Sequence, residues 1–184
     1  MKALLYCTKG KPYIAYQDID YDCDDTCCSF NGFLPFTRQE LYDYDISLDK
    51  TLNGKIVAKC DIDLITKNDL VFDRGFNEET QLSLRDIGNY VGDKEYYCLH
   101  LSNIEVFDNP KELSEYCVYT YPTFDKNNTL EKAPQNMCRV LTKNGYPYIL
   151  ISIQPQWLCK ILNGEKTVEV RRKIISPLKN LIGS

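Results

Sequence analysis

The sequence predicts an α+β protein in which short strands form a small sheet and a few short helices pack on it. Apolar residues alternate along LNGKIVAKCDIDLI, which is typical of a half-buried strand. One face of this strand should hold Ile56, Ala58, Cys60, Ile62 and Leu64. Capping-box patterns that begin at Thr37 and Ser83 predict short helices. A strand, a helix and a second strand are predicted within residues 148–173.

Composition indicates one globular domain. The 184 residues are 43% hydrophobic and 26% charged, which is enough apolar material for a sizeable core. The formal net charge of −4 argues against general attraction to nucleic acid, so such binding would need a local basic patch. The apolar run in MKALLYCTKGK is too short for a secretory segment or a membrane span, and we expect no membrane partner.

Nine cysteines without a secretory segment favour a reducing compartment, and we expect the protein in the cytoplasm. Cys23, Cys27 and Cys28 form the densest thiol cluster. A zinc site needs four ligands, usually Cys or His, and the chain has one histidine, His100. We therefore expect reduced thiols, no metal and no cofactor, and a structural role for His100 on a strand.

The remaining elements follow from local signals. Residues 2–8 should form an apolar strand, and the helix at Ser83 should turn Ile87, Tyr90 and Val91 inward before it ends at Gly92. Strands over residues 95–102 and 104–107 should be separated by a turn. Residues 68–80 look loop-like, and insertion loops are expected at about residues 17–50 and 66–82.

An acidic run near the N-terminus has two interpretations. The acids are Asp18, Asp20, Asp22, Asp24 and Asp25. In an extended segment the first four share one face, because side chains alternate along a strand. They form either a solvated edge that discourages strand pairing or an acidic surface for a basic partner, such as a nucleic-acid-handling host protein.

The segment from residue 148 onward carries the candidate site. Pro155 suits the first turn of a helix, and Asn163-Gly164 provides its left-handed end. The helix should bury a stripe of Trp157, Leu158, Ile161 and Leu162.

The last predicted strand separates apolar from charged side chains. Val168 and Val170 should point one way, and Glu169 and Arg171 the other, with Lys166 at the mouth of the turn. Arginine provides a planar donor fork, lysine a point charge and glutamate an acceptor, a set suited to an anion or a base edge. A solvated strand with cross-paired charges is the alternative interpretation.

The line SIQPQWLCKILNGEKTVEVRR resembles the ASCH domain, a family with a PUA-like β-barrel. The matching signature positions are Gly164, Lys166, Glu169 and Arg171. The segments LLYCTKGKPY, LNGKIVAKCDID, LHLSNIEVFDNPKELSEY and APQNMC are similar to ASCH-like proteins common in phages and mobile elements of Firmicutes. The resemblance implies a single small barrel over residues 1–184 with a few short helices packed on it.

The order of these segments differs from the family, in which the SIQP module comes first. Here residues 148–173 follow APQNMC, as in a circular permutation, which a closed barrel with adjacent termini tolerates. A truncated tandem arrangement is the competing explanation. In the permuted barrel, Lys9 and Lys11 would approach the segment after Arg171.

The resemblance implies a pocket for RNA, a modified nucleoside or a nucleotide, lined by Lys166, Glu169 and Arg171 with help from Lys9. Some relatives hydrolyse acylated cytidine with a Lys, a Thr and a Glu, but Glu169 stands where their Thr would be, and Thr167 lies elsewhere. We therefore expect a non-catalytic binding module.

Two other functions remain open. One is an anti-defence inhibitor, for example of a CRISPR nuclease, encoded by a phage or mobile element. Its basis is the acidic run, the 14 tyrosines and the phage-like resemblance. The other is a small amidohydrolase that acts on acylated nucleosides.

Overall fold

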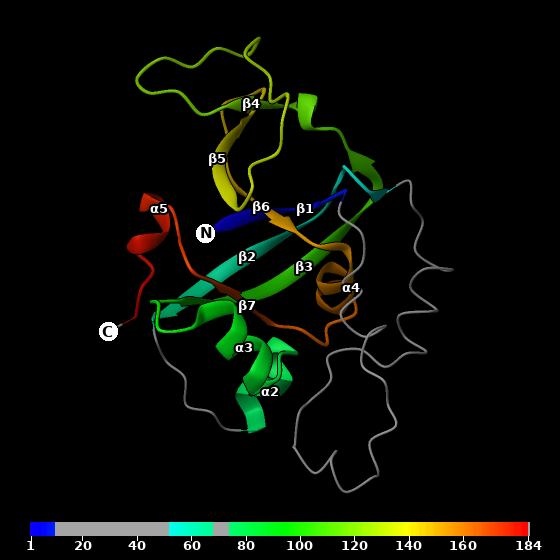
Figure 1. The fold of residues 1–184 in the computed structure, drawn as a ribbon. Coiled ribbons are helices and arrows are strands. Elements are labelled where there is room, and N and C mark those ends of the chain that lie inside the picture. The colour runs from blue at the N-terminus through cyan, green and yellow to red at the C-terminus, as the bar shows by residue number, and fades with distance from the viewer. Residues whose placement is uncertain (10–51, 68–73, 184) are drawn as a thin grey trace, which may run out of the picture.

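The computed structural model describes residues 1–9, 52–67 and 74–183. These residues form one open seven-stranded sheet with a few short helices, which confirms the α+β class (Figure 1). The strands are β1 (Lys2–Cys7), β2 (Ile56–Lys67), β3 (Tyr97–Lys111), β4 (Tyr116–Val118), β5 (Met137–Thr142), β6 (Pro147–Ile153) and β7 (Val168–Arg171). Their order is β4-β5-β6-β1-β2-β3-β7, and β1 with β6 is the parallel pair in a sheet that is otherwise antiparallel.

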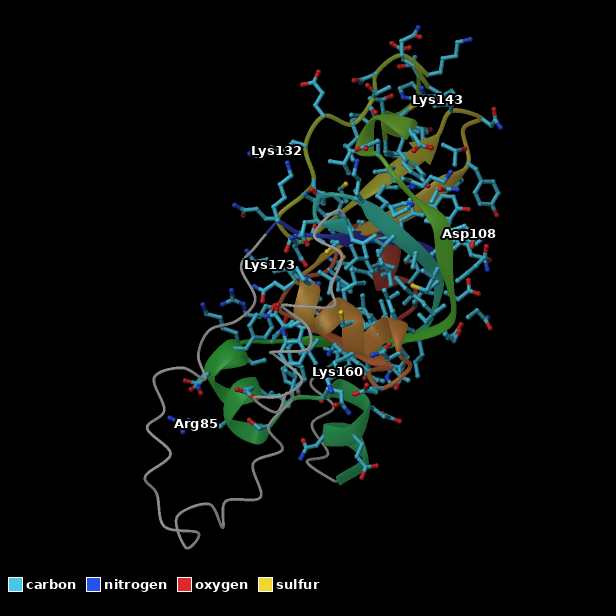
Figure 2. All side chains as sticks on the ribbon, turned by 90° about the vertical axis from the view of Figure 1, so that its right-hand side faces the viewer. Arg85, Asp108, Lys132, Lys143, Lys160 and Lys173 are labelled. Atoms are coloured by element: carbon cyan, nitrogen blue, oxygen red, sulfur yellow. The ribbon has the colours of Figure 1, made fainter. Side chains whose placement is uncertain are left out.

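The helices are α2 (Arg74–Thr80), α3 (Leu84–Val91), α4 (Pro155–Leu162) and α5 (Ser176–Lys179), and a 3-10 turn (Leu113–Glu115) precedes β4. Helices α2 and α3 lie together at one end of the molecule, and β4 with β5 lies at the other (Figures 1 and 2). Among the described residues, no helix is long and apolar enough to cross a membrane.

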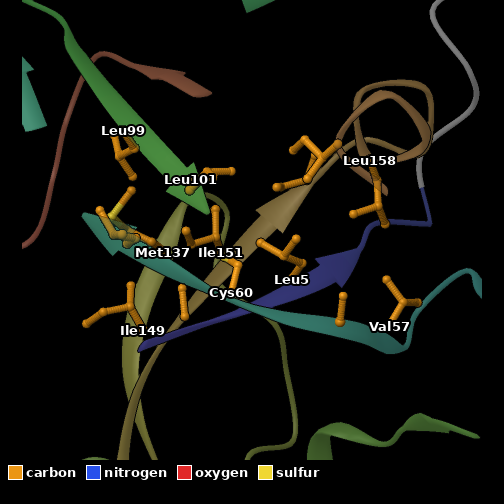
Figure 3. Close-up of a cluster of buried hydrophobic side chains, with 14 of the residues drawn as sticks. Leu5, Val57, Cys60, Leu99, Leu101, Met137, Ile149, Ile151 and Leu158 are labelled. Atoms are coloured by element: carbon orange, nitrogen blue, oxygen red, sulfur yellow. The ribbon is translucent and has the colours of Figure 1, made fainter. Parts of the chain in front are cut away.

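Strand β1 lies near the middle of the sheet and is buried on both faces. Leu5 and Cys7 belong to the largest apolar cluster, where Ile151 of β6 and Leu158 of α4 also pack (Figure 3). Leu4 and Tyr6 point the other way, into a second cluster with Val140 and Leu150. Burial on both faces explains why β1 reads as a continuous apolar run and not as an alternating one.

Strand β2 departs from the predicted single apolar face at both ends. Its pairing with β3 shifts register at three places: between Ile56 and Ala58, between Lys59 and Asp61, and between Ile62 and Leu64. Ile56 therefore packs in the second cluster, Leu64 is 40% exposed, and Ile65 is fully buried in its place. The shift between Ile62 and Leu64 places an extra residue in β2, and an extra residue reverses the faces of the residues beyond it.

Helix α3 confirms the capping prediction. Ser83 accepts from the backbone N–H of Asp86, the Asp86 side chain accepts from the Ser83 backbone, and Gly92 ends the helix at φ +57°. Ile87 and Val91 are buried as predicted, but Tyr90 is 41% exposed, so its predicted inward position is wrong.

Two other segments differ from expectation. Residues 97–111 form the single strand β3, because the predicted turn at Asn103 is a positive-φ residue (φ +49°) within a continuous ladder. Residues Arg74–Thr80, expected to be loop-like, form α2. The module from β6 through α4 to β7 is confirmed, with Pro155 in the first turn and Gly164 at φ +77°.

Several predictions fall outside the described residues. These are the helix at Thr37, the thiol cluster of Cys23, Cys27 and Cys28, Lys11, and the acids Asp18, Asp20, Asp22, Asp24 and Asp25. The described cysteines, Cys7, Cys60, Cys98, Cys117, Cys138 and Cys159, are free thiols.

Candidate functional site: a buried Lys–Glu–Arg triad

Strand β7 is buried on both faces. Val168 and Val170 pack against Ile87 and Val91 of α3. Glu169 lies opposite Leu99 of β3, a residue of the largest apolar cluster, and therefore faces the interior. The two-sided division of β7 is as predicted, but neither of its faces is open to water.

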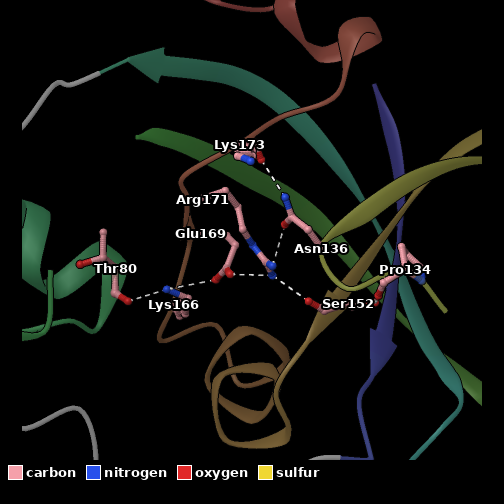
Figure 4. A network of polar contacts seen from close by, with 8 residues as sticks. All are labelled: Thr80, Pro134, Asn136, Ser152, Lys166, Glu169, Arg171 and Lys173. Atoms are coloured by element: carbon pink, nitrogen blue, oxygen red, sulfur yellow. Dashed lines mark hydrogen bonds and ion pairs between the residues drawn. The ribbon is translucent and has the colours of Figure 1, made fainter. Parts of the chain in front are cut away.

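Lys166, Glu169 and Arg171 form a buried ion-pair triad, with 2%, 8% and 9% of their surfaces exposed. The Glu169 carboxylate holds both cations: Oε1 lies 2.9 Å from Arg171 Nη2, and Oε2 lies 3.3 Å from Lys166 Nζ (Figure 4). The charges are thus cross-paired, but in the interior, so the solvated-strand interpretation is wrong.

Arg171 links β7 to the far part of the sheet. Its Nη1 donates to Asn136 Oδ1 at 2.9 Å, and its Nη2 donates to the backbone oxygen of Ser152 in β6 at 2.8 Å. Asn136 Nδ2 in turn donates to the backbone oxygen of Lys173 at 2.8 Å. Strands β6 and β7 are not ladder partners, so these side-chain bonds connect two parts of the sheet that the backbone leaves unpaired (Figure 4).

Lys166 ties the triad to α2. Its Nζ donates to the backbone oxygen of Thr80, the last residue of α2, at 2.6 Å, and lies 5.3 Å from the centre of the Trp157 ring. Carbonyl groups at a helix C-terminus carry partial negative charge and favour a cation. Burial lowers the pKa of Lys166 below its ordinary value, Glu169 opposes that shift, and Arg171 adds to it.

Three buried polar atoms near the C-terminal end of β6 have no hydrogen-bond partner among the described residues. They are Arg171 Nε, Gln156 Oε1 in the first turn of α4, and Thr8 Oγ1 just after β1. The Gln156 side chain is fully buried, and its Nε2 donates to Gln154. An unsatisfied buried polar atom costs about 1–3 kcal/mol, so such atoms are rare and often mark functional sites.

The other predicted site residues lie apart from the triad. Gly164 is exposed and serves the turn after α4. The Lys9 side chain lies against Gly54, in the turn before β2, and makes none of the contacts of the triad. His100 lies on β3 with Nε2 3.4 Å from Thr66 Oγ1, in agreement with a structural role.

Sequence reasoning missed Asn136, Ser152 and Gln156. Ser152 had a signal, since it is a polar residue inside the apolar run ILISI. Asn136 and Gln156 lie in APQNMC and SIQPQW, two segments that carry the family resemblance, but their spacing gives no hint that they meet Arg171 or the end of β6.

The donor set does not suit a metal ion. Among the described residues, no group of three or more His, Cys, Asp or Glu side chains is arranged to hold one. Two of the three charged groups in the triad are cations, which repel a metal ion and attract an anion or a hydrogen-bond acceptor.

Comparisons of the chain with protein-family models, with curated proteins and with solved structures find no match. The fold and the site therefore define the class on their own: an α+β protein with an open, mostly antiparallel sheet and a buried, cation-rich polar cluster where β6, α4 and β7 meet.

Proposed function

We propose that this protein is a non-catalytic, ASCH-like module that binds RNA or a nucleotide at the end of β6. In this proposal one base lies beside the triad, where Arg171 and Gln156 offer a donor and an acceptor. Base edges display donors and acceptors side by side, and Arg, Gln and Glu are the side chains that pair with them.

The observation that carries the proposal is the buried triad together with its unsatisfied neighbours. Lys166, Glu169 and Arg171 are removed from water at a cost that well-packed apolar residues would avoid. Arg171 Nε and Gln156 Oε1 add to that cost, because neither has a hydrogen-bond partner in the part of the chain that the structure describes. Groups buried at such a cost are expected where a ligand completes their hydrogen bonds.

We propose that the sheet is a PUA-like barrel in permuted order, left open between β6 and β7. The bonds from Arg171 to Ser152 and Asn136 support this reading, because they join the strands that such a barrel would bring together.

Binding without catalysis is favoured by the residues around Lys166. Three residues after Lys166 the chain has Glu169, which forms two ion pairs. Thr167 is exposed, and its backbone N–H donates to the Glu79 oxygen, so its hydroxyl does not lie among the buried triad residues. This chain therefore has no hydroxyl nucleophile in the place where a small amidohydrolase of this kind would need one.

The proposal is tested with Gln156→Met, which keeps the side-chain volume and removes the acceptor. A panel of nucleosides and nucleotides is titrated by calorimetry against the native protein and this variant. We expect a member of the panel to bind, and Gln156→Met to weaken it roughly tenfold, the equivalent of one hydrogen bond of about 1.4 kcal/mol. Gln135→Met, the same change at an exposed position, should leave affinity unchanged.

Two results would refute the proposal. One is the absence of binding by every member of the panel. The other is a Gln156→Met protein that binds as tightly as the native one.

An inhibitor of a host nucleic-acid-handling protein is the second candidate, favoured by an exposed aromatic surface. Tyr121 is 86% exposed, Tyr146 57% and Phe124 43%, and the Phe124 ring lies about 3.9 Å from where a Cβ on Gly145 would be. Exposed aromatic side chains are common anchors of protein interfaces. Replacing Tyr121 and Tyr146 with Ser should abolish inhibition of the target nuclease; full inhibition by that variant would exclude this surface.

A further inference from the structure

Charge is divided unequally along this chain. Residues 132–184 contain nine Lys and Arg but two Asp and Glu, whereas residues 1–131 contain 13 Lys and Arg and 24 Asp and Glu. The net charge of −4 is therefore the sum of an acidic part and a strongly basic C-terminal part. The C-terminal part also supplies Glu169 and Arg171.

Exposed cations lie directly beside the buried triad. Arg172 and Lys173 follow Arg171 and are exposed, and the Lys173 backbone is held by Asn136, the residue that also accepts from Arg171. The Arg172 guanidinium lies 5.1 Å from the centre of the Tyr90 ring, which is 41% exposed on α3.

Two more cations extend this surface. Lys132 and Arg85 are exposed, and Figure 2 shows them on the same side of the molecule as Lys173, above and below it. We call Arg85, Lys132, Arg172 and Lys173 the basic rim. Asp108 lies on the opposite side of that view.

The basic rim is free of carboxylate partners within the described residues. Three lysines elsewhere are paired: Lys2 with Asp61, Lys59 with Glu105 and Lys67 with Glu95. None of the four rim side chains forms such a pair with a described residue. Other exposed lysines, such as Lys126 and Lys143, also form no ion pair with a described residue, so the rim is distinguished by its place beside the triad and Tyr90. Unpaired cations gathered next to an aromatic ring are the usual surface for a phosphodiester strand.

We infer that the ligand of the triad site is one unit of a single-stranded nucleic acid, whose neighbouring phosphates lie on the basic rim. This inference rests on the proposed function and extends it from a free nucleotide to a strand. A base can enter the triad site only when it is unstacked, which favours a single strand over a duplex. The Tyr90 ring, backed by Arg172, offers a surface on which the next base stacks.

The inference predicts how strongly oligonucleotide affinity depends on salt concentration. Each phosphate contact with a single strand contributes about −0.7 to the slope of log K against log salt concentration. Four rim cations thus predict a slope of about −3 for a strand that reaches all of them. A mononucleotide, which covers little of the rim, should show a much smaller slope.

The experiment compares a mononucleotide with a seven-residue oligonucleotide of the same base, as RNA and as DNA, by calorimetry at 50 and 200 mM salt. The native protein should bind the oligonucleotide more tightly and with the steeper slope. A double variant, Arg172→Ala with Lys173→Ala, should reduce the slope by about 1.4, the value for two phosphate contacts. It should weaken oligonucleotide binding, though not to the level of the mononucleotide, because Arg85 and Lys132 remain, and it should weaken mononucleotide binding much less.

A matched control removes two exposed lysines, Lys126 and Lys143, of which Lys143 lies at the far end in Figure 2. This control should keep the full slope. An oligonucleotide that binds no more tightly than the mononucleotide, or a double variant with native affinity for it, overturns the inference and leaves the proposed function standing. Absence of binding by both ligands overturns both, and equal competition by a polyglutamate peptide shows a protein-binding surface and overturns the inference alone.

Discussion

Replacing Arg171 with methionine tests the triad directly. The variant keeps most of the aliphatic volume and removes the guanidinium group. It therefore deletes the bonds to Asn136 Oδ1 and the Ser152 oxygen and the ion pair with Glu169. Glu169 keeps one cation, Lys166, at 3.3 Å.

The expected loss of stability follows from burial. Arg171 and Glu169 expose 11% and 10% of their side chains, so solvent cannot take over from the missing partner. Removing one member of a buried ion pair costs about 3–5 kcal/mol. For a chain of this size, about 2–4 °C of Tm is lost per kcal/mol, so Tm should fall by roughly 6–20 °C.

Urea unfolding followed by circular dichroism measures this change. Arg172→Met, the same substitution one residue later at an exposed position, should cost no more than about 0.5 kcal/mol. A loss below about 1 kcal/mol for Arg171→Met would refute the reasoning, because it would mean that the triad does not exist as a buried unit.

A triple variant separates stability from function. With Lys166, Glu169 and Arg171 all replaced by methionine, no unpaired charge remains, and apolar replacement of a buried ion-pair set is often neutral or stabilising. We expect an unfolding free energy within about 2 kcal/mol of the native value, well above that of Arg171→Met, together with loss of nucleotide binding. A triple variant as unstable as the single one would show that the fold itself requires the charges.

Two further predictions concern the sheet. Burial raises the pKa of the Cys60 thiol from 9.0 to about 12. Between these pH values the thiol is therefore ionised in the unfolded protein and neutral in the folded protein. Stability should therefore fall with rising pH by up to about 1.4 kcal/mol per unit from this group, and Cys60→Ala should make the loss between pH 9.5 and 11 less steep in urea titrations. Ile65→Ala should cost about 2–5 kcal/mol and Leu64→Ala under 1, because the bulge buries the first and exposes the second. Equal losses would contradict the bulge.

Local sequence signals determine much of this fold. The capping box at Ser83, the proline in the first turn of α4 and the positive-φ glycine after it each act within a few residues. For that reason the ends of α3, α4 and β6 follow from the sequence. The register of β2 does not, because the bulges at Ile56 and Leu64 depend on how β3 pairs beside it.

For the candidate site too, some features follow from local sequence and others depend on distant packing. The alternation of Val168, Glu169, Val170 and Arg171 along β7 predicts two different faces, and both exist. Burial of the charged face comes from packing against Leu99 and α4, which no local pattern encodes. The partners Asn136 and Ser152 lie 35 and 19 residues from Arg171, and only the curvature of the sheet brings them to it.

Arg171 and Arg172 are adjacent in the chain but belong to different environments, because Arg171 is the last residue of β7 and Arg172 lies beyond the end of the strand, where it is exposed. Arg171 is buried with fixed acceptors, so its interaction with a ligand depends on geometry and is screened little by salt. Arg172 is exposed beside Tyr90, so its attraction for phosphate reaches further and weakens as salt rises. In the proposed function, selectivity and strand affinity therefore reside in separate residues. A buried variant such as Gln156→Met should change which base is bound without changing the salt slope. A rim variant should change the salt slope without changing which base is bound.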